Sequence, residues 1–176
     1  AYNDKYVVYN YKQNIWYVGT MGRTAWLDSP LFNTLVAAKQ NTPLLQHEFG
    51  SESNEGAGAQ AMTSFIETAD FDIDDGDYYA FIDRLIPDIR FTGSSATQPS
   101  LAITVGVRNA PGAGAGQTYV QTAQATAVSP VNLYSDTLYY RLRGRQMRLR
   151  VASTDTGVKW ILGSTRLSYK PDGRKS

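Results

Sequence analysis

The sequence predicts an all-β protein, an antiparallel β-sandwich preceded by short strands of the type found in a β-propeller blade. Polar and apolar residues alternate with a period of two in many short segments, as in strands that bury one face. No amphipathic helical pattern persists for about three turns anywhere in the 176 residues. Twelve tyrosines, six phenylalanines and three tryptophans, in a chain that is 42% hydrophobic, supply the large side chains that strands favour.

The first 50 residues carry short strand patterns that together have the size of one propeller blade. Five segments show them: residues 6–11, 15–18, 24–27, 35–38 and 44–49. The first two flank a three-residue hairpin loop, in which Asn14 is suited to the left-handed conformation. A blade is a four-stranded sheet of about 40 to 45 residues, and a propeller needs about four or more blades. Residues 1–50 are therefore expected either to add strands to the next domain or to end a propeller whose other blades lie outside this sequence.

Residues 51–63 are rich in Gly, Ser, Ala and Glu, have little to bury, and are predicted to be a linker. Alternation then resumes, and residues 64–176 are predicted to form the antiparallel β-sandwich from about seven strands. The clearest strand is residues 101–107, where Leu, Ile and Val occupy every second position. The other expectations are a strand at residues 65–73, a turn at 74–77, a strand or short helix at 78–85, a flexible loop at 110–116 and an exposed strand at 119–128.

The stretch from Leu138 to Val151 shows the strand pattern together with a change of phase. Apolar residues occupy even positions up to Leu142 and odd positions from Met147 onward. A shift of one residue would turn every side chain to the other face unless the backbone absorbs it. We therefore expect a bulge or tight bend at residues 144–146, with apolar residues on one side of the strands and arginines on the other.

The net charge of +1 conceals a strong asymmetry along the chain. Residues 46–90 contain eleven acidic residues and two arginines, whereas residues 136–176 contain ten basic residues and three acidic ones. Such segments are expected either to face each other within the fold or to meet between the subunits of an oligomer.

Two sets of charged residues are the candidate functional residues. The subunit-interface candidates are Arg141, Arg143, Arg145, Arg148 and Arg150. For these arginines a protein interface is favoured over a solvated face and over contacts with nucleic acid. The candidates for facing a lumen or a partner are Asp70, Asp72, Asp74, Asp75 and Asp77. A calcium loop is disfavoured for these aspartates, because Gly76 and Phe81 occupy the wrong positions for an EF-hand.

The remaining patterns do not predict an enzyme, a metal site or a cofactor. The chain has no cysteine and a single histidine, His47, which is too few for a zinc-protease motif or a histidine-based triad. Three alternating glycines at residues 112–116 lack the spacing and the following helix of a nucleotide-binding loop. No apolar run is long enough to cross a membrane as a helix.

Four aromatic residues support an alternative function. Trp16, Tyr17, Trp26 and Trp160 would give a carbohydrate- or receptor-binding module surfaces on which to stack a ligand. Because all four lie in strand patterns, packing in a core is the favoured interpretation for each.

Several sequence phrases together resemble one family. In the C-terminal part these are RLRGRQM at residues 141–147, the STDTGV, W and LG residues of 153–163, and PDGR at 171–174. Upstream they are LLQHEFG at 44–50, FIETADFDIDDGD at 65–77 and RLIPDI at 84–89. These phrases resemble virion structural proteins of short-tailed bacteriophages, namely the tail-nozzle or packaged-DNA-stabilising proteins.

The resemblance implies a structural subunit of a phage tail rather than an enzyme. Such a subunit is expected to form a homo-oligomeric ring, a hexamer by resemblance, around the channel through which DNA leaves the virion. Its partners would be other tail or adaptor proteins, with genomic DNA only in transit. The resemblance also implies a propeller upstream, so that this sequence would be the C-terminal portion of a longer protein. Carboxylates facing the channel would repel DNA phosphates and prevent adhesion.

Overall fold

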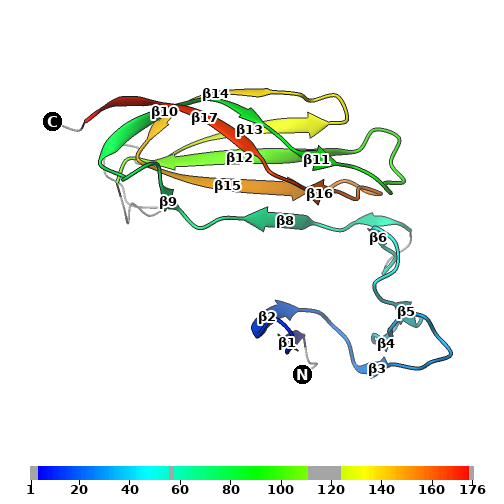
Figure 1. Ribbon diagram of the computed structural model, residues 1–176. Coiled ribbons are helices and arrows are strands. Elements are labelled where there is room, and N and C mark those ends of the chain that lie inside the picture. Colours follow the sequence, from blue (N-terminus) through cyan, green and yellow to red (C-terminus); the bar gives the residue numbers. More distant parts are fainter. Residues whose placement is uncertain (1–3, 56–57, 111–123, 175–176) are drawn as a thin grey trace. The chain divides into compact units, whose positions relative to one another are not determined.

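The computed structural model describes residues 4–55, 58–110 and 124–174, and within them the chain is all-β, with every strand pair antiparallel (Figure 1). No helix occurs in these ranges, so the all-β prediction is confirmed. The chain divides into two compact units. Unit 1 comprises residues 1–50 and 54–58, and unit 2 comprises residues 51–53 and 59–176.

The described part of unit 1 contains five strands. They are β1 (Lys5–Asn10), β2 (Ile15–Thr20), β3 (Ala25–Leu27), β4 (Val36–Ala38) and β5 (Leu45–Gln46). The predicted hairpin of the first two segments is formed by β1 and β2, and Asn14 has the expected left-handed backbone, with φ of 54°. β4 and β5 also pair with each other. The strands divide into a two-stranded sheet, β1-β2, and a three-stranded sheet, β3-β4-β5. The expected four-stranded blade is therefore not formed within the described residues.

Unit 2 is built on two larger sheets. The first consists of β13 (Gln124–Asn132), β12 (Ser100–Arg108), β15 (Gln146–Ser153) and β8 (Ser64–Glu67) in that order, with β9 (Phe71–Asp72) also paired to β15. The second consists of β14 (Leu138–Gly144), β10 (Tyr78–Ile86) and β17 (Arg166–Arg174). Two short ladders complete the unit: β11 (Ile89–Arg90) with β16 (Ile161–Leu162), and β6 (Glu52–Ser53) with β7 (Gln60–Ala61). The last ladder lies within the segment predicted to be a linker.

The two larger sheets share one hydrophobic core. The larger sheet contributes, among others, Leu101, Ile103, Val105, Val107, Met147 and Val151, and the smaller sheet contributes Ile82, Leu85, Leu138, Tyr140 and Leu142. The hydroxyl of Tyr140 also donates a hydrogen bond to the carbonyl of Ile103, at 3.4 Å, which satisfies a buried polar group between the sheets. Each fully buried aliphatic side chain contributes on the order of 1.5 to 3 kcal/mol, so this core is the main source of stability in unit 2.

The predicted bend at residues 144–146 is the point where the chain passes from one sheet to the other. Gly144 ends β14 in the smaller sheet, and Gln146 begins β15 in the larger sheet. A Cβ atom on Gly144 would lie 2.7 Å from Cβ of Val107, so the corner needs glycine. Arg145 holds the corner with its backbone, donating to the carbonyl of Arg108 at 2.8 Å and accepting from the amide of Ile73 at 2.9 Å. The phase of the sequence pattern changes because each strand faces the shared core from its own sheet.

Three local expectations can be compared with the structure. The predicted strand at 65–73 is interrupted. β8 and β9 pair with separate parts of β15, and residues 68–70 between them belong to neither strand. Phe65 and Phe71, at this edge, are exposed. Residues 78–85 form a strand rather than a helix, with a register shift between Ile82 and Arg84. The predicted loop at 110–116 and the first part of the predicted strand at 119–128 lie outside the described residues, apart from Ala110.

Candidate interaction surfaces

The β1–β2 hairpin carries large apolar side chains on both of its faces. Antiparallel register places Val7 opposite Val18 and Tyr9 opposite Trp16 on one face. The other face carries Tyr6, Val8, Ile15 and Tyr17. All eight side chains are exposed, with Val7 at 63%, Trp16 at 65% and Val18 at 78%.

The hairpin is ordered by its own cross-strand contacts rather than by a core. The rings of Tyr9 and Trp16 stack with centroids 4.5 Å apart, and the Tyr9 hydroxyl donates to Oδ1 of Asn14 at 2.9 Å. The ring of Tyr6 lies over Gly19, where a Cβ atom would collide with it. Within the described residues no third strand pairs with β1 or β2, and Ala37 is the one buried hydrophobic residue of unit 1. Contiguous apolar surface of this kind marks a site of association.

The rest of unit 1 is held by a polar cluster centred on Arg23, whose side chain is only 6% exposed. Its Nε donates to Nε2 of His47 at 2.9 Å, and its Nη2 pairs with Glu55. Lys39 pairs with the other oxygen of Glu55 at 2.8 Å. Hydrogen bonds from Arg23 and Lys39 lower the pKa of Glu55 to about 2, and burial and the charge of Arg23 lower the pKa of His47.

On the outer face of the larger sheet, the arginine-rich and acidic segments meet within one chain. Arg150 lies opposite Glu67 across β15 and β8, and Arg148 reaches the other oxygen of Glu67 at 3.3 Å. Arg108 on β12 pairs with Asp70 at 2.8 Å. Of the two arrangements that the charge distribution left open, the structure places these residues in the intramolecular one.

The bend between the sheets makes further contacts with the acidic segment. Arg145 donates from Nε to the carbonyl of Gly76 at 2.6 Å and approaches the carboxylate of Asp77 at 3.9 Å. Gln146 donates to Asp72 at 2.9 Å. Arg145, Arg148 and Arg150, among the interface candidates, thus have partners in their own chain.

The outer face of the smaller sheet carries an excess of positive charge. The described charged side chains on its three strands are the cations Arg84, Arg141, Arg143, Arg166 and Lys170 and the carboxylates Asp83 and Asp172. Arg143 pairs with Asp172 and lies over the Tyr79 ring at 3.9 Å, and Lys170 pairs with Asp83 at 3.4 Å. Arg84, Arg141 and Arg166 are exposed and form no ion pair within the described ranges. We call these three residues the basic patch.

The turn between β9 and β10 carries carboxylates that are not neutralised. Asp74 and Asp75 are exposed and form no ion pair with any residue the structure describes. The turn is tight: Asp74 and Gly76 have φ of 59° and 74°, and the backbone N–H of Asp77 donates to Oδ1 of Asp75 at 2.9 Å. In the part of the chain that is described, no three acidic or histidine side chains are grouped so as to hold a metal ion.

Three of the four aromatic residues expected in a core are on the surface. Trp16, Tyr17 and Trp26 are 65%, 47% and 53% exposed, so that prediction was wrong for them. Trp160 is half-buried against the core of unit 2, and its Nε1 donates to Oγ of Ser64 at 2.9 Å. The signal that was missed is the lack of alternation: residues 6–9 and 15–18 are continuous apolar runs, which give a strand two apolar faces.

No protein-family model matches the chain, and no curated protein matches its sequence. The described residues form no helix with the length and apolar character needed to span a membrane.

Proposed function

We propose that the chain is a structural subunit of a bacteriophage tail, the nozzle or distal tail tube, where copies form a ring around the DNA exit channel in the virion. The observation that carries this proposal is the β1–β2 hairpin, which exposes apolar side chains on both faces and pairs with no third strand among the residues that the structure describes. The sequence resemblance to short-tailed phage proteins supports the choice of a phage tail as the assembly. Its other partners would be neighbouring tail or adaptor proteins.

The apolar hairpin supports assembly because water contact with so many large side chains is costly. Burial of apolar surface contributes about 25 cal/mol per Å², so covering both faces of the hairpin favours association strongly. A ring requires a head-to-tail contact between two different surfaces of the subunit. A hairpin that projects apolar groups to both sides suits insertion between neighbouring copies. In the full proposal these strands are the end of a β-propeller, and unit 2 is a β-sandwich formed by the two sheets that share a core.

Charge complementarity on unit 2 supports association of copies as well. Within the described residues the basic patch forms no ion pair with a carboxylate, and Asp74 and Asp75 form none with a cation, so one copy offers each set of charges to another. The remaining acidic side chains, if turned to the channel, would repel DNA phosphates in transit. Because Arg145, Arg148 and Arg150 are engaged within the chain, the proposed interface role falls mainly to Arg141 of the original candidates.

The oligomeric state tests the proposal. Light scattering coupled to size exclusion should show a closed oligomer for the chain, and Val7→Lys with Val18→Lys should convert it to monomer. Val128→Lys is the matched control, since Val128 is 61% exposed on the larger sheet. A denaturing immunoblot of purified virions should show a particle-associated band. A monomeric parent chain together with absence from virions would overturn the tail role.

The exposed aromatic residues favour a second candidate function, a β-sandwich module that binds carbohydrate or a cell-surface receptor. Trp16, Tyr17 and Trp26 present rings to solvent, and such rings stack on ligands with apolar faces. Binding of a glycan by the monomer, lost on Trp16→Ala or Trp26→Ala, would favour this function. Ring formation without glycan binding would favour the structural one.

A further inference from the structure

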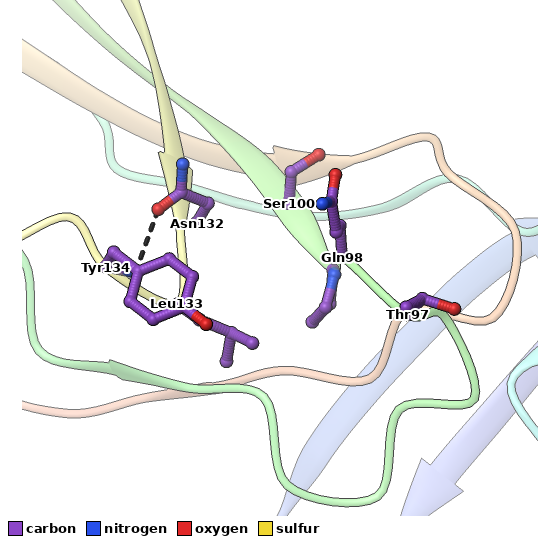
Figure 2. Close-up of a pocket in the computed structure, with 7 residues that line it drawn as sticks. Thr97, Gln98, Ser100, Asn132, Leu133 and Tyr134 are labelled. Atoms are coloured by element: carbon purple, nitrogen blue, oxygen red, sulfur yellow. Dashed lines mark hydrogen bonds between the residues drawn. The ribbon is translucent and has the colours of Figure 1, made fainter.

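Unit 2 contains an open hollow where β12 begins and β13 ends. It has a volume of about 510 Å³ and is lined by Thr97, Gln98, Pro99, Ser100, Asn132, Leu133 and Tyr134. Figure 2 shows Asn132, Leu133 and Tyr134 on one side of the hollow, opposite Thr97, Gln98 and Ser100. This volume lies in the range of about 300 to 1,000 Å³ that is typical of small-ligand sites.

The polar groups of the hollow are available to a ligand. The side chains of Thr97 and Gln98 form no hydrogen bond with any described residue. Asn132 is fixed in place, because its Oδ1 accepts from the backbone N–H of Tyr134 at 2.8 Å, and within the described chain its Nδ2 is not engaged. The Ser100 hydroxyl donates to Asp155 at 2.7 Å and so presents its lone pairs as an acceptor.

We infer that this hollow binds a neutral carbohydrate. None of its lining residues carries a charge, which disfavours phosphate, sulfate and other ionic ligands. Primary amides and hydroxyls each supply both donors and acceptors, as do the neighbouring hydroxyl groups of a sugar ring. The Tyr134 side chain, 87% exposed at the rim beside Leu133, offers an apolar face for the C–H side of that ring.

The inference shares its ligand class with the second proposed function and in that respect rests on it, but it places the ligand on unit 2 instead of on the tryptophans of unit 1. It does not depend on ring formation. None of the residues that line the hollow belongs to the apolar hairpin or to the basic patch.

The test uses NMR of the isotope-labelled chain with glucose, galactose and N-acetylglucosamine, followed by an array of neutral oligosaccharides. Binding should perturb signals of residues 97–100 and 132–135. Tyr134→Ala should weaken binding by about tenfold or more. Asn132→Asp, which keeps the Oδ1 acceptor of the turn and removes the Nδ2 donor, should do the same. Tyr139→Ala is the matched control, because Tyr139 is also an exposed tyrosine, 79% exposed, and lies in β14 outside the hollow.

Each outcome of this experiment decides the inference. Perturbation confined to the hollow, with loss in the two variants and retention in the control, supports it. No perturbation by any sugar of the panel overturns it, as does binding of anionic glycans alone. If the sugars bind but only Trp16→Ala or Trp26→Ala removes binding, the hollow is overturned while the binding-module function stands.

Discussion

Glu67 lies directly opposite Arg150 across β8 and β15, and Nη1 of Arg150 meets its carboxylate at 2.5 Å. The other oxygen of the same carboxylate forms an ion pair with Arg148. The Arg150 guanidinium also lies 4.1 Å from the centre of the Phe65 ring. One glutamate at the sheet edge thus forms ion pairs with two arginines of the neighbouring strand. These arginines therefore stabilise unit 2 itself.

Reversing the charge of Arg150 tests this assignment. Arg150→Glu should lower the free energy of unfolding of unit 2 by about 1 kcal/mol, since like charges would then lie directly opposite each other. Adding Glu67→Arg should restore part of the loss, because the pair is re-formed with its charges exchanged. Denaturant titration of both singles and the double gives the coupling energy. A coupling of zero would contradict the pairing.

The basic patch should respond differently, because its cations have no partner within the described part of the chain. Arg84→Glu with Arg141→Glu should leave the stability of unit 2 within about 0.5 kcal/mol, as is usual for surface positions. The same change should weaken ring assembly in sedimentation experiments, most clearly at low salt. Arg90→Glu, at another exposed arginine of unit 2, is the control. Assembly that is unchanged at low salt would remove the patch from the proposed interface.

The corner at Gly144 predicts a steric effect. Gly144→Ala places a methyl group 2.7 Å from Cβ of Val107, which is fully buried, so we expect a loss of about 1 to 3 kcal/mol in the stability of unit 2. Val107→Ala in the same chain should not recover that loss, because alanine keeps the Cβ atom that the new methyl group meets. Thermal unfolding of the variants measures both effects. Gly22→Ala, where a Cβ meets no atom within 4 Å, should be nearly neutral.

Acid should loosen unit 1 in two steps. The pKa of His47 is lowered, so its neutral form is favoured in the folded state, and the stability it contributes is present above its ordinary pKa of 6.5 and is lost as the pH falls below that value. The pKa of Glu55 is lowered from 4.5 to about 2, so its contribution is present above 4.5 and is lost between there and pH 2. Fluorescence of Trp26, whose ring lies 4.7 Å from that of His47, reports the change.

Two substitutions separate the steps of this acid response. Glu55→Gln should abolish the lower step and leave the upper one, whereas His47→Gln should remove the upper step. The unit 2 signal of Trp160 serves as an internal reference, since Trp160 belongs to the other unit. A Trp26 signal that does not change between pH 7 and pH 3 would contradict the role of the Arg23 cluster.

The sequence indicated the parts of the fold whose patterns are local. The alternation of Leu101, Ile103, Val105 and Val107 specified a buried strand, and the phase change around Gly144 specified a bend. The partners of these strands could not be predicted, because β15 is paired with β8, whose Glu67 is 83 residues distant from Arg150. A period-two pattern indicates which face of a strand is buried, but it does not identify the strand that pairs with it.

The candidate residues were less predictable than the strands. The sequence groups the five arginines as one set of interface candidates, but the corner at Arg145 places Arg141 and Arg143 in one sheet and Arg148 and Arg150 in the other. The pairing of charges then depends on strand order, which a single sequence does not contain. The hollow beside Tyr134 is likewise formed by two loops that only the pairing of β12 with β13 brings together.

The difference between local and distant strand pairing also sets the order in which the chain acquires its surfaces. The β1–β2 hairpin closes over a few residues, as in the Tyr9 to Asn14 contact across five positions, and such hairpins form in about 1 to 10 μs. The sheets of unit 2 require contacts between remote segments, which fold more slowly. A newly synthesised chain therefore exposes the apolar β1–β2 hairpin before unit 2 has folded. The local concentration of nascent copies then helps to determine whether they assemble or aggregate.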